Sequence, residues 1–149
     1  MSNGGPHVQI AAFCEKAIVG QGGQLSVIGL VEQVTNNQPN PDTPDEMPPF
    51  SLGPLTLVIA LWADQTKGRY AIKIRPVEPS GHELDALKMP VQFEGGPRGI
   101  NLITPMQFPV EHEGTYWFDI IFSAGSSTED RLLSRVPLEV RYQPQLTAG

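Results

Sequence analysis

Residues 114–122 constrain the fold of this chain most, because their aromatic and β-branched side chains alternate with a period of two. Large apolar side chains share one face of the strand that this period predicts: Tyr116, Phe118, Ile120 and Phe122. Trp117, Asp119 and Ile121 fall on the opposite face. Turn residues bound the run, with Gly114 before it and residues 124–127 after it. The pattern predicts a central strand of an antiparallel sheet, with the first face in the core.

Shorter runs of strand character recur along the chain between turns rich in glycine and proline. The predicted strands are residues 7–14, 24–34, 55–62, 70–75, 91–93, 100–104, 106–110, 116–122 and 136–142. Glycine and proline occur 15 times each, which is too often for a helical protein and typical of many short strands. The sequence therefore predicts an all-β fold, an antiparallel two-sheet sandwich of about eight strands.

The length of 149 residues predicts a single domain, which we assign to residues 7–143. Residues 1–6 are expected to form a flexible leader and residues 144–149 a tail. Residues 35–54 contain six of the 15 prolines together with Asp42, Asp45 and Glu46. Proline removes donors from a β-ladder, so this stretch is expected to be a long, acidic crossover loop that links the two sheets passively.

The charge balance and the cysteine content limit the class of partner and the compartment. The net charge is −6 and the ten basic residues are scattered singly, whereas binding to phosphates needs clustered Lys and Arg. Cys14 is the single cysteine, and neither a secretory signal nor a long apolar run is visible in the sequence. We therefore expect a cytoplasmic protein that binds neither nucleic acid nor membranes.

Several segments resemble a bacterial family of small proteins that is classed as a domain of unknown function. The resemblance lies in VQIAAFCEKA at residues 8–17, GQLSVIG at 23–29, GTYWF at 114–118 and VPLEV at 136–140. It implies an immunoglobulin-like (Ig-like) sandwich and implies no activity. The chain departs from the family pattern at Gln24, where the family often has lysine, and at residues 35–54, which are longer and richer in proline.

The ionisable residues do not form a recognisable catalytic or metal-binding motif. Glu111, His112 and Glu113 are the one tight cluster, but in an extended segment the histidine points away from the two carboxylates. Cys14 lies on an apolar strand, where a thiol acts as a small hydrophobe. We expect no catalytic residue, no cofactor and no metal, and the chain is predicted not to be an enzyme.

The strongest functional prediction concerns apolar residues on the faces of strands that point away from the core. If residues 116, 118, 120 and 122 face inward, Trp117 and Ile121 face outward, and Val58, Ala60 and Trp62 do the same on the earlier strand. These five residues predict an interface with another protein or with further copies of the chain. The alternative is a module that binds a small or anionic ligand at its loop tips, with Arg98 and His112 in the lining. A metal-dependent hydrolase ranks third.

Overall fold

The computed structural model describes residues 4–40, 42–43, 45–124 and 130–144, which form strands and no helix. The strands are β1 (His7–Val19), β2 (Leu25–Val31), β3 (Gln33–Asn36), β4 (Phe50–Val77), β5 (Leu87–Val110), β6 (Gly114–Ser123) and β7 (Arg131–Tyr142). The predicted all-β class is confirmed. Among the described residues there is no helix with the length and apolar character to cross a membrane.

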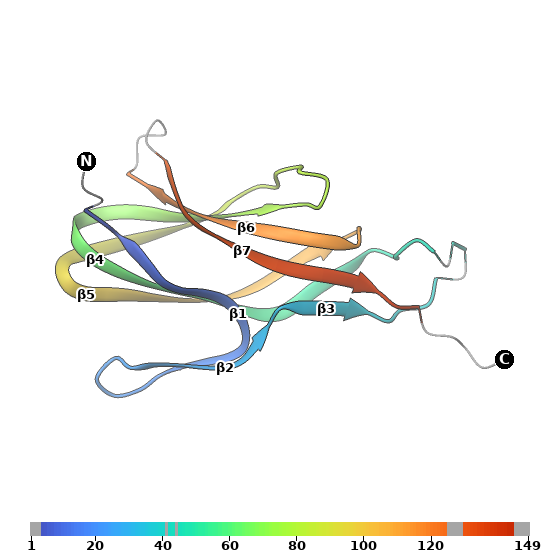
Figure 1. The fold of residues 1–149 in the computed structure, drawn as a ribbon, viewed down its shortest axis with the longest axis horizontal. Coiled ribbons are helices and arrows are strands. Elements are labelled where there is room, and N and C mark those ends of the chain that lie inside the picture. The colour runs from blue at the N-terminus through green and yellow to red at the C-terminus, as the bar shows by residue number, and fades with distance from the viewer. Residues whose placement is uncertain (1–3, 41, 44, 125–129, 145–149) are drawn as a thin grey trace.

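The strands hydrogen-bond into one sheet in the order β2-β1-β4-β6-β7-β3, and β5 pairs with β4 outside this path. All pairs are antiparallel except β3 with β7, which is parallel, so the prediction of a purely antiparallel fold was wrong. Glu32 alone separates β2 from β3, and β3 continues in the direction of β2 (Figure 1). β3 therefore lies beside β7, and the two strands run in the same direction.

The two longest strands each bend midway, and β4 changes partner at its bend. The first half of β4 pairs with β1 from Thr56 to Trp62, and the second half pairs with β6 from Ala71 to Val77. The bends lie at one end of the molecule, near Asp64 in β4 and near Gly95 and Gly96 in β5, all at positive φ (Figure 1). The predicted strands 55–62 and 70–75 are therefore one strand, as are the three predicted segments between 91 and 110.

The bends bring the two halves of the sheet face to face across one hydrophobic core. The ring of Phe13 in β1 packs edge-on against Phe118 in β6, with the centroids 4.8 Å apart. Tyr116, Phe118 and Ile120 are fully buried and Phe122 is partly buried against the same cluster, which confirms the predicted inward face of residues 114–122.

The Pro-rich connection is shorter than predicted, because Gln33–Asn36 belong to β3 and β4 begins at Phe50. Met47, in the middle of the connection, is 8% exposed and belongs to the core cluster. The connection therefore contributes a core side chain, and the prediction of a passive crossover was wrong on this point. Positions 41 and 44 of the loop, residues 1–3 of the leader, positions 125–127 of the predicted turn and residues 145–149 of the tail lie outside the described residues.

Candidate interaction surface

The first half of β4 separates core residues from a second, outward-facing set by simple alternation. Leu57, Ile59 and Leu61 belong to the core cluster. Val58, Ala60 and Trp62 alternate with them and therefore lie on the other face of the strand, as predicted. We call this side of β1, β4 and β5 the outer face. Val58 and Ala60 are buried there, at 0% and 5% exposed, whereas Trp62 is 43% exposed.

Two isoleucines on the neighbouring strands extend the outer face beside these residues. The register places Ile10 of β1 opposite Ala60, and Ile103 of β5 opposite Val58. Directly opposed residues in an antiparallel pair point to the same side of the sheet. Ile10 and Ile103 are both more than a third exposed. Sequence analysis missed them as surface residues, although the alternation that directs Phe13 into the core directs Ile10 outward.

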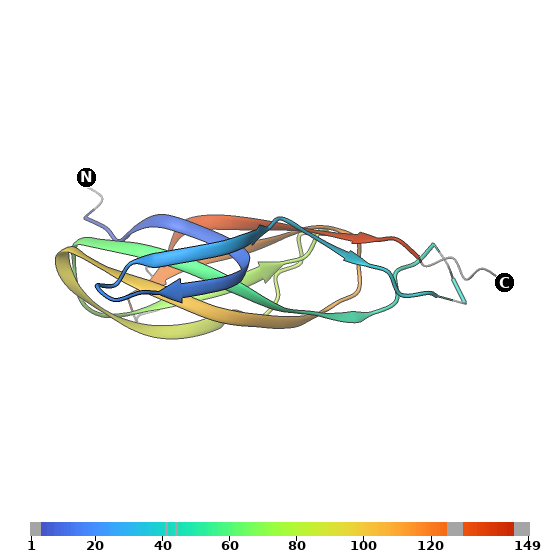
Figure 2. The same cartoon turned by 90° about the horizontal axis from the view of Figure 1, so that it is seen from below.

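The hairpin of β1 and β2 continues beyond the sheet as an arm, which we define as residues 15–30. In the part of the chain that the structure describes, the core cluster has no member between Phe13 and Val31. The arm lies apart from the other strands in Figure 1, and seen from below it lies in front of β4 and β5 (Figure 2). Four of its large apolar side chains are 41–64% exposed: Ile18, Val19, Ile28 and Leu30.

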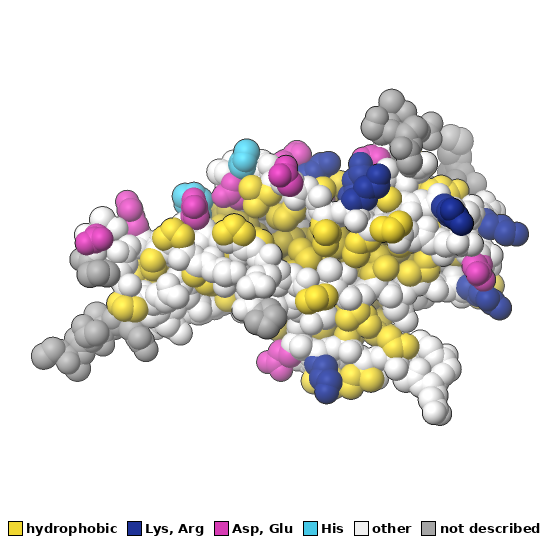
Figure 3. Space-filling model, turned by 180° about the vertical axis from the view of Figure 1, so that it is seen from behind, with side chains coloured by type: hydrophobic (Ala, Val, Ile, Leu, Met, Phe, Trp, Pro, Cys, Tyr) yellow, Lys and Arg dark blue, Asp and Glu magenta, His cyan; other side chains and the backbone are white. Residues whose placement is uncertain are grey.

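The hydrophobic side chains of the arm are visible from the side opposite to Figure 1. In that view the arm projects at the lower right and carries hydrophobic side chains below a hydrophobic band on the body of the molecule (Figure 3). The charged side chains gather mainly along the upper edge and the right-hand end. The arm also carries charged side chains beside its hydrophobic ones, so the two kinds of surface are only partly separated on this side of the molecule (Figure 3).

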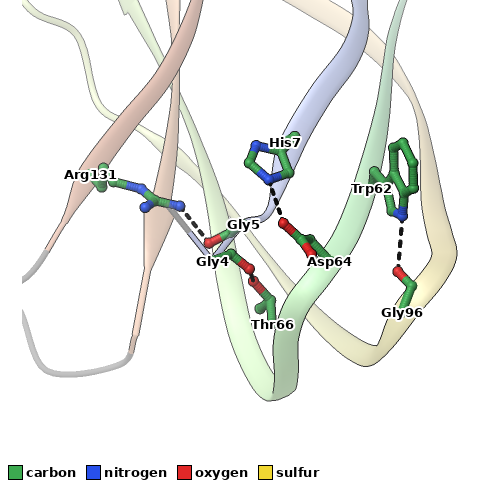
Figure 4. A network of polar contacts seen from close by, with 8 residues as sticks. All are labelled: Gly4, Gly5, His7, Trp62, Asp64, Thr66, Gly96 and Arg131. Atoms are coloured by element: carbon green, nitrogen blue, oxygen red, sulfur yellow. Dashed lines mark hydrogen bonds and ion pairs between the residues drawn. The ribbon is translucent and has the colours of Figure 1, made fainter. Parts of the chain in front are cut away.

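Trp62 is held in one orientation at the edge of an open depression. Its indole Nε1 donates a hydrogen bond to the carbonyl oxygen of Gly96 at 2.9 Å (Figure 4). The depression is lined by residues from the arm tip, β1, β4 and β5: Gln9, Gly22, Gly23, Leu61, Trp62, Pro97, Arg98, Gly99 and Asn101. The arm tip and the exposed indole therefore border the same hollow.

A network of polar contacts holds the end of the molecule where the long strands bend. The Nε2 of His7 lies 2.9 Å from Oδ2 of Asp64, and Arg131 donates from Nη2 to the carbonyl oxygen of Gly5 at 2.6 Å (Figure 4). The backbone N–H of Gln65 donates to the carbonyl oxygen of Gly4 at 2.7 Å. The carbonyl groups of Gly4 and Gly5 are thus hydrogen-bonded to the body of the molecule, whereas the flexibility of the leader stays a prediction.

The predicted interface residues Trp117 and Ile121 lie on a different surface. β6 pairs with the second half of β4, beyond the bend, so Trp117 is not a neighbour of Trp62 in the sheet. Ile121 is 5% exposed, and the guanidinium of Arg135 covers the Trp117 ring at 4.9 Å from its centroid. The predicted single patch is therefore divided between two surfaces.

Ion pairs cover the face that carries Trp117. Three of them join β4, β6 and β7 or the residues beside these strands: Lys73–Asp130 at 2.9 Å, Arg75–Glu83 at 3.3 Å and Arg135–Asp119 at 2.7 Å. Paired charges of this kind suit a face that stays in contact with water. The apolar contact surface is thus confined to the outer face and the arm.

The two predicted ligand residues, Arg98 and His112, are not brought together. The guanidinium of Arg98 lies 2.9 Å from a carboxylate oxygen of Glu94, beside the bend of β5. His112 follows β5 at the opposite end of that half-strand and lines a hollow with Asp45, Glu46, Glu111 and Glu113. Arg98 and His112 therefore line different hollows, and the binding of a ligand by either residue stays a prediction.

The histidine, cysteine and acidic side chains are the candidates for a metal site or a catalytic nucleophile. No set of three or more His, Cys, Asp or Glu side chains is placed to hold a metal ion within the described ranges. Cys14 is fully buried, and this burial raises the pKa of its thiol above the usual value. The raised pKa keeps the thiol protonated and poorly nucleophilic at neutral pH.

Comparison with known proteins identifies a family but no activity. Residues 9–141 match the model of a family of unknown function, which covers nearly the whole chain. No curated protein matches the chain.

Proposed function

We propose that this chain, which belongs to the family of unknown function DUF6941, is a non-catalytic protein that acts through protein–protein contacts, including contacts between its own copies. One observation carries the proposal. Nine large hydrophobic side chains are exposed among the described residues, and all but Leu87 and Leu132 lie on the outer face or on the arm. The members of this contact surface are Ile10, Ile18, Val19, Ile28, Leu30, Trp62 and Ile103.

The physical reason is the cost of leaving such a surface in water. Single exposed hydrophobic residues are ordinary, whereas several gathered on neighbouring strands are characteristic of binding surfaces. Burying apolar area contributes about 25 cal/mol per Å². Trp62 adds to this, because an indole whose orientation is already held by a hydrogen bond loses little freedom on binding. Tryptophan is also enriched at interfaces.

We also propose that the fold is an Ig-like sandwich in which the bent β4 and β5 contribute to both sheets. The side chain of Tyr116 supports this assignment. Its hydroxyl donates to the carbonyl oxygen of His112 at 3.0 Å, four residues upstream near the start of β6. A tyrosine that bonds back to the backbone in this way at a strand corner is a feature of Ig-type sandwiches.

The mass of the protein in solution tests self-association directly. We expect light scattering at micromolar concentration to give a mass above the 16.2 kDa of one chain. Ile103→Arg should lower that mass toward the monomer, since it places a charge on the outer face at a residue that is already exposed. Leu132→Arg is the control, because Leu132 is also exposed but lies outside the contact surface. A monomeric wild-type protein would refute self-association.

A second candidate function is the binding of a small polar or anionic ligand in the depression beside Trp62. The observation in its favour is that Gln9, Arg98 and Asn101 line the hollow next to the fixed indole. A ligand present at 100 times its dissociation constant would stabilise the fold by about 2.7 kcal/mol. A thermal-shift screen with sugars, nucleotides and small anions therefore tests it. A positive compound should lose its effect in Trp62→Ala, and a screen without any shift rejects this candidate.

A further inference from the structure

Three strands, β5, β3 and β2, each pair with one other strand only, and two of them are protected against pairing with a further strand. β5 pairs with β4 alone, and its free edge carries Pro90, Pro97, Pro105 and Pro109. β3 has four residues and leads into the Pro-rich connection. Proline and short length are the usual devices that keep edge strands from pairing.

The third of these strands is β2, which is protected neither by proline nor by a short length. β2 pairs with β1 and with no other strand of the described chain. Its sequence, LSVIGLV, contains neither proline nor a charged residue. Gly29, with φ at 70°, bends the hairpin at the base of the arm, so the straight part of the free edge is residues 25–28.

The arm is also a weak element when it stands alone. The arm has two strands, joined by residues 20–24, and four of its large apolar side chains are about half exposed. A two-stranded hairpin is marginally stable in water, whereas three or more strands with a shared apolar face are stable. The arm therefore gains most from a partner that adds strands to its edge.

Charge indicates that this partner is a second copy of the chain. The chain carries a net charge of −6, so two copies repel one another over most approaches. The stretch from residue 17 to residue 31 is the exception: the charged residues of the arm, Glu15 and Lys16, lie in β1, and no charged residue lies between Lys16 and Glu32. Two antiparallel copies of β2 related by a two-fold axis place neutral residues opposite neutral residues, with no like charges in contact.

We propose that residues 25–27 of β2 pair antiparallel with the same residues of a second copy, with Ser26 opposite its own copy, which joins the two arms into a four-stranded sheet. This inference rests on the proposed self-association and names the element that mediates it. Backbone hydrogen bonds across the two edges supply the register, and the exposed Ile18, Ile28 and Leu30 of both copies supply the apolar area.

Charge substitution on the free edge tests the pairing. Ser26 is exposed, and the two-fold pairing of residues 25–27 places it opposite its own copy. Ser26→Lys and Ser26→Glu should each raise the dimer dissociation constant at least about tenfold, which is 1.4 kcal/mol. An equimolar mixture of the two variants should restore the dimer. Thr35→Lys, at an exposed position of the β3 edge, is the control that should leave the dimer unchanged.

Cross-linking gives an independent measurement on folded protein. Ser26→Cys should form covalent dimers with a short bis-maleimide, while Thr35→Cys on the β3 edge should not. The native Cys14 is fully buried and does not compete. If the wild-type protein is a dimer but Ser26→Lys remains one and Ser26→Cys does not cross-link, the β2 pairing is wrong and the proposed function stands. A monomeric wild-type protein overturns both.

Discussion

At the scale of single residues, Phe118 carries the central contacts of the core. Its ring packs edge-on against Phe13 at 4.8 Å and against Phe108 at 5.2 Å, so it joins β6 to both β1 and β5. The side chain is fully buried. One residue thus links the two halves of the bent sheet, and its removal leaves a cavity that rigid strands cannot close.

We therefore expect Phe118→Ala to lower the free energy of unfolding by about 3–5 kcal/mol, the range for a buried aromatic residue cut back to alanine. Urea denaturation followed by tryptophan fluorescence measures this loss. Leu132→Ala, at a half-exposed residue, should change the free energy by no more than about 0.5 kcal/mol. A loss below about 1 kcal/mol for Phe118→Ala would contradict its central position.

At the scale of secondary-structure elements, the Pro-rich connection between β3 and β4 is part of the core as well as a crossover. Met47 belongs to the same cluster as Phe118, although prolines and acidic residues surround it in the sequence. The side chain of Asn36 helps to hold the connection, since its Nδ2 donates to the carbonyl oxygen of Pro48 at 3.3 Å. This hydrogen bond thus holds the connection next to Met47, which packs in the core.

Met47→Ala should cost about 2–3 kcal/mol, which lowers the melting temperature by about 4–12 °C in a domain of this size. Replacement of residues 37–49 by a short Gly/Ser linker should lower it by at least as much. Differential scanning calorimetry compares both variants with Asn37→Ala, an exposed position in the same connection. A melting temperature unchanged by Met47→Ala would show that the connection is passive after all.

A second element-scale contact closes the start of β7 onto β4. Hydrogen bonds from Lys73 and from Ser123 lower the pKa of Asp130 below its usual value. Because the folded-state pKa is the lower one, the contact stabilises the fold above the unfolded-state pKa of about 3.9. This stabilisation is lost as the pH falls through the folded-state pKa.

Asp130→Asn should therefore be less stable than the wild type at neutral pH. The two proteins should become equally stable at a pH low enough to protonate Asp130 in both the folded and the unfolded wild type. Urea midpoints measured from pH 7 down to pH 2 follow the convergence. Asp85→Asn, an exposed position, is the control and should run parallel to the wild type at every pH. A constant gap between Asp130→Asn and the wild type across the acid range would contradict this account.

At the scale of the whole molecule, the two outward surfaces of the bent sheet differ in character. One carries ion pairs across β4, β6 and β7, and the other carries the outer face and the arm with their exposed hydrophobic residues. The paired charges suit the first surface to contact with water, and we propose that copies of the chain associate through the second. Because the two surfaces differ in this way, self-association through the second surface would make the stability of the fold depend on protein concentration.

If copies associate through the outer face and the arm, the melting temperature should rise with protein concentration, since the dimer stabilises the folded chain by mass action. We expect a shift on the order of 5 °C over a hundredfold range of concentration. Ile103→Arg should remove the concentration dependence without changing the melting temperature at high dilution. A wild-type melting temperature independent of concentration would contradict the association.

What the sequence determined by itself is the all-β class and the direction of side chains in the strands that carry Phe118 and Trp62. The period of two places Phe118 inward and Trp62 outward without any knowledge of the neighbours, because successive side chains in a strand point to opposite faces. The likeness of four short segments to an uncharacterised family was also readable, and the family match over residues 9–141 confirms it.

What only the tertiary structure decided is which strands are neighbours and what lies over each outward face. Local alternation cannot show that β4 changes partners at its bend, which separates Trp62 from Trp117, or that Arg135 covers the Trp117 ring. It also cannot show that Met47 reaches the core or that residues 15–30 leave the sheet as an arm. These features depend on contacts between residues far apart in the chain, whereas a sequence pattern reports only on a strand and its adjacent turns.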